Sequence, residues 1–141
     1  MRSMEVDRSG CEVLARDECL RLLTTQSLGR LGIHAGALPV ILPVAYALVD
    51  GSVIVRTHDR AQIYGAARDA VVAFEADCPP GPDGGGWSVH GTGLAEEVTD
   101  PDELARLHAL PLRQWATNGA ERFVRISLDL LSGRRLAPSA V

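Results

Sequence analysis

The chain has 141 residues, of which 46% are hydrophobic and 23% charged, and its formal net charge at pH 7 is −4. These values are typical of one globular domain with a core of its own, so we expect a single domain over residues 1–141, with a flexible N-terminus at 1–11 and a tail at 137–141. The acidic balance argues against nucleic-acid binding, and no apolar run approaches the ~20 residues that a membrane-spanning helix needs.

The first half of the chain predicts one short helix followed by strands. Residues 17–25 begin with acidic side chains and place their leucines on one broad face, which is typical of an amphipathic helix. The strands that we expect next lie at 28–35, 38–49 and 52–57. Asp50-Gly51 separates the last two, and this dipeptide between apolar runs is the strongest short-range signal for a β-hairpin.

The second half predicts two further helices among strands. In chain order we expect a helix at 59–68, a strand at 70–76, a loop at 77–86 and a strand at 87–98. A helix at 99–108 and a last long strand at 122–131 follow. Asp59 would open the first of these helices. Thr99 or Asp100 would cap the second, with Pro101 at its first position.

Antiparallel strands dominate this pattern and the helices are short. The fold class is therefore mainly β (α+β), or a β-barrel with a few helices. A doubly wound parallel sheet is disfavoured, because the strongest predicted connection is a tight hairpin.

Arg56 and Thr57 stand where a predicted strand gives way to a predicted helix. An arginine fork, a hydroxyl and the free N–H groups of a helix start are all suited to binding a phosphate. A solvated strand end beside a helix cap explains the same residues without any ligand. His58, next in the chain, is a further candidate for a polar contact.

Other site classes find little support in the sequence. The glycine-rich segments lack the GK[ST] of a phosphate-binding loop, and the four histidines have no spacing typical of a metal site. No GxSxG motif indicates a nucleophilic serine. Three cysteines without CxxC spacing, and an N-terminus without a signal-peptide core, indicate a reducing cytoplasm.

Several segments together resemble a known family. The segments LGRLGIHAGALPVILPVAYALVDGSVIVRT, VVAFEAD, GWSVHGTGLAEEVTDPDEL and FVRISLDLLSGRRL stand in the order and spacing of the pyridoxamine 5′-phosphate oxidase-like flavoproteins. The resemblance covers roughly residues 12–136 and is strongest to a short bacterial branch that includes nitroimidazole-reductase-like proteins. It implies a six-stranded antiparallel split β-barrel with short flanking helices. It also implies a homodimer with FMN in two clefts at the interface.

The resemblance also implies which residues contact the cofactor. The flavin ring would lie against the strand around Pro43, its phosphate would lie near Arg56, and Trp87 would close the site from the other subunit. Trp87 could equally be a core residue. The complete expected set is Pro43, Val44, Ala45, Arg56, Thr57, His58, Arg60, Gln62, Trp87 and Ser88.

Two positions depart from the family pattern. Gln62 stands where relatives commonly carry a lysine or arginine that pairs with the phosphate, and Ala45 stands where this branch often has a polar residue. Arg60, three residues after Thr57, is placed to compensate for the missing charge at Gln62.

Three functions remain open at this stage. The resemblance implies an FMN-dependent oxidoreductase that moves hydride or electrons between a nicotinamide cofactor and a small oxidised molecule. A deazaflavin in place of FMN would suit the weaker phosphate contact at Gln62. A non-catalytic protein that stores flavin or senses a small ligand is the third. Pyridoxamine phosphate oxidation itself is disfavoured, because the chain is short and its C-terminal part matches no substrate-phosphate residues.

Overall fold

The computed structural model describes residues 4–82, 85–112 and 119–136; the predicted tail at 137–141 and the first three residues lie outside these ranges. The described helices are α1 (Arg16–Leu23), α2 (Gln62–Ala67) and α3 (Pro101–His108). The described strands are β1 (Glu12–Val13), β2 (Leu28–Ala35), β3 (Leu38–Val49), β4 (Ser52–His58), β5 (Ala70–Cys78), β6 (Trp87–Glu97), β7 (Glu121–Ile126) and β8 (Leu130–Arg135). None of these helices has the length and apolar character needed to cross a bilayer.

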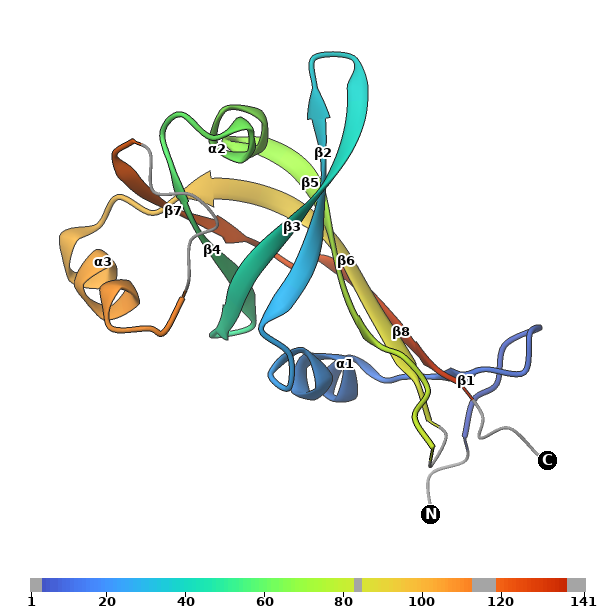
Figure 1. Cartoon of the computed structure of the whole chain (residues 1–141). Coiled ribbons are helices and arrows are strands. Elements are labelled where there is room, and N and C mark those ends of the chain that lie inside the picture. The colour runs from blue at the N-terminus through green and yellow to red at the C-terminus, as the bar shows by residue number, and fades with distance from the viewer. Residues whose placement is uncertain (1–3, 83–84, 113–118, 137–141) are drawn as a thin grey trace.

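Six strands close into an antiparallel barrel. The order around the barrel is β6–β5–β2–β3–β4–β7, and pairing between β7 and β6 completes the circle. β8 pairs with the other part of β6 and extends the sheet beyond the barrel, with β1 at its edge. Figure 1 shows β5, β6 and β8 leaving the barrel together toward the termini, beside α1. The predicted six-stranded antiparallel barrel with short flanking helices is confirmed.

The hairpin between β3 and β4 forms as the sequence predicts. Asp50 and Gly51 are its two loop residues, with φ values of 51° and 78°. Two successive positive φ angles match the right-handed twist of the flanking strands. Because β4 pairs with β3 only from Tyr46 onward, Pro39 and Pro43 lie where β2 is the only hydrogen-bonded neighbour of β3. A strand edge is where proline is tolerated.

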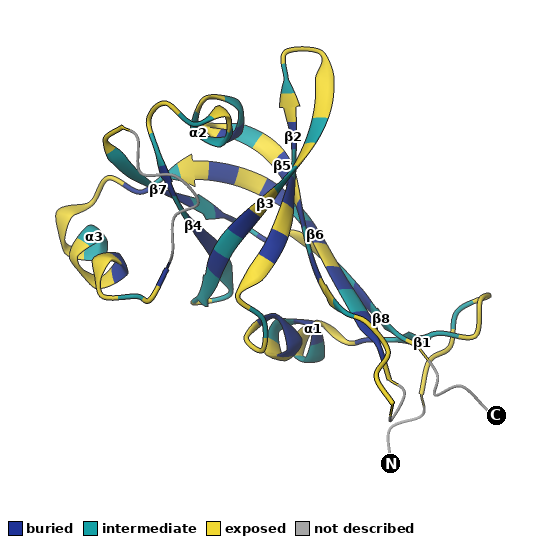
Figure 2. Cartoon of the chain, viewed as in Figure 1, coloured by how far each residue is buried: buried dark blue, intermediate teal, exposed yellow. Residues whose placement is uncertain are grey.

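The buried side chains form two clusters. The larger cluster fills the barrel and continues under α1, and its aromatic pair is Tyr46 and Phe74, whose ring centroids lie 4.8 Å apart. The hydroxyl of Tyr46 donates a hydrogen bond of 2.6 Å to the carbonyl of Leu23, which connects α1 to the barrel. The smaller cluster lies outside the barrel, where α3 covers Ile54 and Phe123. In Figure 2, buried and exposed residues alternate along β5 and β6, as expected for strands with one face on a core.

The helix predicted at 59–68 is shorter than expected, because α2 begins at Gln62 and ends at Ala67. Asp59 does not cap it. The Asp59 side chain instead accepts a hydrogen bond of 3.0 Å from the backbone N–H of Ala120, and the two backbones bond as well. The residues that the sequence assigns to the first helical turn are thus held against the start of β7. The cap predicted at Thr99 or Asp100 is Asp100, whose side chain accepts from the N–H of Glu103.

The last long strand predicted at 122–131 is wrong as a single element. The chain forms β7 and β8 with a break at residues 127–129, and the two strands pair with different parts of β6. The break lies against Gly93: a Cβ there would stand 1.6 Å from the carbonyl oxygen of Ser127. The chain bends where it crosses β6, and only a glycine leaves room for that crossing.

Candidate functional site

The candidate site lies on the outside of the barrel, on the sheet face formed by β3, β2, β5, β6 and β8, which we call the outer face. Cross-strand pairing sets its side chains in rows, since directly opposite residues point to the same side. One end of this face is apolar. Its large exposed side chains include Ile41 at 74%, Val71 at 64% and Leu130 at 71% exposure. A groove of about 500 Å³ runs between β2, β3 and β5 at this end.

A polar row crosses the same face beside the apolar end. Arg30 of β2 lies opposite Pro43 on one side and Glu75 of β5 on the other. Glu75 in turn lies opposite His90 of β6, and His90 lies opposite Ser132 of β8. The ring nitrogen Nε2 of His90 and the hydroxyl of Ser132 are 2.8 Å apart, within hydrogen-bonding distance. We call these four polar residues, 30, 75, 90 and 132, the polar row.

The residues predicted to contact the flavin ring divide between the two faces of the sheet. Pro43 is exposed and Ala45 is partly exposed on the outer face, whereas Val44 points into the barrel core. Ser88 belongs to the outer face, where it lies opposite Asp77 of β5. Trp87 faces the other way, is 8% exposed and packs in the core. Because β2 and β5 separate β3 from β6, one protomer does not bring Pro43 and Ser88 together.

Arg56 and Thr57, the predicted phosphate contacts, point to opposite sides of β4. Thr57 is 5% exposed, on the side of the strand that faces the barrel interior. Arg56 lies on the α3 side, where its Nε donates a hydrogen bond of 2.9 Å to Glu121 and a terminal nitrogen donates one of 3.2 Å to the carbonyl of Leu112. His108 Nδ1 lies 2.9 Å from the other carboxylate oxygen of Glu121. The structure therefore gives Arg56 a protein carboxylate as its partner.

The end of β4 and the residues after it carry polar groups that have no hydrogen-bond partner in the described part of the chain. The Nδ1 atom of His58 is buried and has no hydrogen-bond partner in the described part of the chain. Arg60 and Gln62 are exposed. A Cβ added to Gly119 would approach His58 Nδ1 to 3.1 Å, so this backbone lies close over the imidazole. An orphaned ring nitrogen and an uncommitted guanidinium within three residues are compatible with binding an anion.

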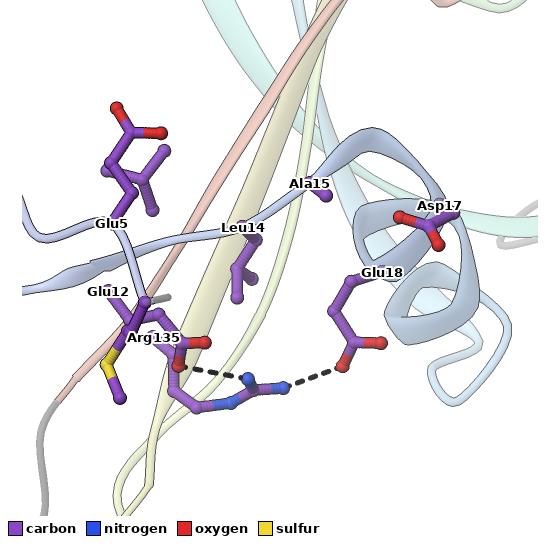
Figure 3. A pocket seen from close by; sticks show the side chains of 9 residues that line it. Glu5, Glu12, Leu14, Ala15, Asp17, Glu18 and Arg135 are labelled. Carbon is purple, nitrogen blue, oxygen red and sulfur yellow. Dashed lines mark hydrogen bonds and ion pairs between the residues drawn. The ribbon is translucent and has the colours of Figure 1, made fainter. Parts of the chain in front are cut away.

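A second cavity, of about 520 Å³, lies between the N-terminal segment, α1 and the end of β8. Figure 3 shows Arg135 reaching between Glu12 and Glu18, which it bonds at 3.2 and 2.7 Å. Hydrogen bonds from Arg21 and Arg135 lower the pKa of Glu18 to about 2. The sequence did not indicate this cavity, because its charges come from both ends of the chain. These ion pairs join β1, α1 and β8, and we assign the cavity no ligand.

No group of three or more histidine, cysteine, aspartate or glutamate side chains in the described ranges is arranged to hold a metal ion. The three cysteines are free, and Cys19, on the buried side of α1, packs in the core.

Comparison with known proteins identifies similar chains. The pyridoxamine 5′-phosphate oxidase family profile matches residues 15–135. An uncharacterized protein from Mycobacterium tuberculosis, Rv0080, is 41% identical over 128 residues, which cover 87% of this chain and 84% of that protein. The family resemblance inferred from the sequence is thereby confirmed.

Two solved structures show the same fold. An FAD binding protein from Mycobacterium smegmatis superposes with a TM-score of 0.78 and 29% identity, covering 90% of this chain and 99% of that one. A protein from Bacteroides thetaiotaomicron, described as a candidate 5-nitroimidazole antibiotic resistance protein, gives a TM-score of 0.67 over 96% of this chain and 93% of that one. Its identity is 10%, so that likeness concerns the fold alone.

Proposed function

Because the chain belongs to the pyridoxamine 5′-phosphate oxidase family, we propose that it is an FMN-dependent oxidoreductase acting on a small molecule. It would move hydride or electrons between a nicotinamide cofactor and a small oxidised substrate in the cytoplasm. The observation that carries the proposal is the match over residues 15–135, together with the FAD binding protein that shares this fold at 29% identity. These similarities support a flavin, and FMN is the flavin that we propose.

The outer face is suited to a flat ring. On β3, Pro43 is exposed there and Ala45 is partly exposed, and Arg30 of β2 lies opposite Pro43. Apolar side chains support an aromatic ring by burying its faces, while a few polar groups fix its orientation. When bound, the flavin supplies the redox chemistry, and the chain binds it, orients it and excludes water.

The cofactor phosphate would lie near the end of β4, where His58 Nδ1 lacks a partner and Arg60 is exposed. Gln62 and the backbone of this segment would complete the contact, whereas Thr57, which faces the barrel interior, could contribute only through its backbone. The guanidinium of Arg56 already donates hydrogen bonds to Glu121 and to the carbonyl of Leu112, so a phosphate would compete with Glu121 for it. The arrangement favours His58 and Arg60 as first contacts over Arg56.

We propose a homodimer with the cofactor at its interface. The apolar end of the outer face exposes the large side chains of Ile41, Val71 and Leu130, and exposed apolar surfaces of this kind commonly mark protein interfaces. Pro43 and Ser88 share that face, with the two strands β2 and β5 between them. A second copy packed on the outer face would cover the patch and bring its Ser88, and Trp87 beneath it, toward the Pro43 of the first.

The decisive experiment is the visible absorption spectrum of the purified protein, with mass analysis of the molecule released on denaturation. We expect a flavin spectrum and the mass of FMN; the mass of FAD or of a deazaflavin would keep the site and change the cofactor. Anaerobic addition of NADH or NADPH should then bleach the flavin band. A colourless protein that takes up no added flavin would refute the proposal.

The role of Arg56 is tested with Glu121. If Arg56 binds phosphate, Arg56→Ala weakens flavin binding and Glu121→Gln strengthens it, because the competing carboxylate is gone. Arg125→Ala is the matched control, since Arg125 pairs with Glu103 on the same side of β7, away from the end of β4. Unchanged affinity in both Arg56→Ala and Glu121→Gln would assign Arg56 a structural role only.

A deazaflavin is the second candidate cofactor, favoured by the exposed, uncharged Gln62 at a position where relatives carry a basic residue. Gln62→Lys should then tighten FMN binding more than deazaflavin binding. A flavin that neither nicotinamide cofactor can reduce would favour the third function, a non-catalytic flavin-binding protein.

A further inference from the structure

Glu75 lies in an unusual place for an acidic side chain. It stands near the middle of the outer face on β5, between Arg30 of β2 and His90 of β6, and the apolar row next to it contains Ala73. Its carboxylate oxygen Oε1 is buried and has no hydrogen-bond partner in the described part of the chain. A buried oxygen without a hydrogen-bond partner lowers the stability of the folded chain. A bound ligand that formed a hydrogen bond with Glu75 would offset this cost.

Asp77 is the second acid on this strand and points to the same face, two residues along. Burial, followed by the hydrogen bond and the charge of Asp77, raises the pKa of Glu75 to about 7, and the positive charge of Arg30 opposes this shift. Two carboxyl groups that close together retain a proton between them near neutral pH.

The other charged groups that face this pair are few. His90 of β6 is bonded to Ser132, and Arg134 of β8 lies across Ser88 from Asp77 but is paired with Asp7 at 2.9 Å. Arg30 is therefore the only charge left to balance the two acids from a neighbouring strand within the described ranges. It is exposed and makes no ion pair there.

We propose that Glu75 is a further ligand-contacting residue of the outer face, and that its carboxyl group donates a hydrogen bond to the bound flavin. The proposal rests on the proposed function and deepens it. A protonated carboxyl donates a hydrogen bond, whereas a carboxylate only accepts. The edge of an oxidised flavin formed by its C4 carbonyl oxygen and N5 carries hydrogen-bond acceptors only, so at that edge the neutral acid matches the ring and the ionised acid repels it. Arg30 offers a second donor in the adjacent strand.

The shared proton can be measured without any ligand. Carbon-13 NMR of the side-chain carboxyl groups in the flavin-free chain should show Glu75 titrating near pH 7. Asp77→Asn should move that midpoint down and Arg30→Gln should move it up, because the two neighbours act in opposite directions. A Glu75 that titrates like an exposed glutamate, or that responds to neither variant, would overturn the shared proton.

The contact with the ligand is measured by flavin titration from about pH 6 to about pH 8.5 in the wild-type chain and in Glu75→Gln. The glutamine amide keeps a donor at every pH, so the ratio of the two affinities should change through the midpoint found by NMR. Wild type should lose roughly fivefold or more relative to Glu75→Gln on the alkaline side, the value of one hydrogen bond. Taking the ratio of the two affinities cancels the pH dependence that both proteins share, which comes from the FMN phosphate and from His90.

Glu75→Ala provides the control that lacks a donor, and should bind roughly fivefold more weakly than wild type on the acid side. A pH-independent affinity ratio between wild type and Glu75→Gln would overturn the ligand contact while leaving the proposed function standing. Absence of flavin binding in every protein at every pH would overturn the proposed function, and the ligand contact with it.

Discussion

Gly93→Ala is the substitution to which we expect the fold to be most sensitive. Its Cβ would lie 1.6 Å from the carbonyl oxygen of Ser127 and 2.6 Å from the carbonyl carbon. Since carbon and oxygen normally approach to about 3.3 Å, the backbone would have to move by more than about 1.5 Å. Such a shift would break the hydrogen bond of 3.0 Å from Ser127 N–H to the Leu94 carbonyl.

The expected loss combines overpacking, about 1–3 kcal/mol, with one backbone hydrogen bond, about 1 kcal/mol. Together they remove about 2–4 kcal/mol from a total that is typically about 5–15 kcal/mol. Urea unfolding followed by circular dichroism, at fixed protein concentration and without flavin, measures this directly.

Gly65→Ala is the control, because its Cβ would meet nothing within 4 Å. It should be neutral or stabilise α2 by up to about 1 kcal/mol. Ordinary surface substitutions change the free energy of unfolding by up to about 0.5 kcal/mol. A Gly93→Ala variant whose free energy of unfolding lies within that range of wild type would show that β7 and β8 do not need a glycine at this crossing.

Three further predictions follow from named contacts. Hydrogen bonds from Arg21 and Arg135 hold the folded pKa of Glu18 at about 2, below its ordinary value of 4.5. The stability they contribute is present above pH 4.5 and is lost as pH falls toward 2. Glu18→Gln should therefore lose about 1 kcal/mol at neutral pH but little in acid, read by thermal unfolding across pH. Burial raises the pKa of Tyr46 to about 12, so Tyr46→Phe should remove the late step from the ultraviolet alkaline titration. It should also cost about 1–2 kcal/mol through the orphaned Leu23 carbonyl. Trp87→Ala should lower stability by about 3 kcal/mol because Trp87 is a core residue, whereas Ser88→Ala should affect flavin retention alone; equal effects of both on stability would contradict this assignment.

The barrel could be predicted because its strongest signals are local. Asp50 and Gly51 set the hairpin, and the near-continuous apolar run of β3 excludes an ordinary helix because two prolines interrupt it. The division of the last strand could not be predicted from its own residues. Segment 122–131 has a continuous strand pattern, and its break depends on Gly93, which lies on another strand more than thirty residues earlier. A close crossing of two segments does not change the hydrophobic periodicity of either segment, so the sequence pattern cannot predict it.

The outer face was predicted only in part, for a similar reason. Pro43, Ala45 and Ser88 entered through the family resemblance, and the structure places all three on one face. The polar row did not enter, because Arg30, Glu75 and His90 become neighbours only through the registers of β2, β5 and β6. In sequence they stand in three separate segments, each with an ordinary alternating pattern.

Arg56 shows most clearly why a sequence pattern must be weighed against its tertiary partner. At a strand end beside a threonine, the Arg56 side chain is suited to a phosphate contact. The local sequence does not show which residue from another part of the chain will be its partner. Its partner Glu121 lies 65 positions along the chain, on the strand that pairs with β4. A carboxylate presents the same two-oxygen edge to a guanidinium as a phosphate does, so the residue type alone cannot distinguish an anion site from an internal ion pair. A phosphate would then compete with Glu121 for Arg56, or be bound by Arg60 and by His58, whose Nδ1 atom has no hydrogen-bond partner in the described part of the chain.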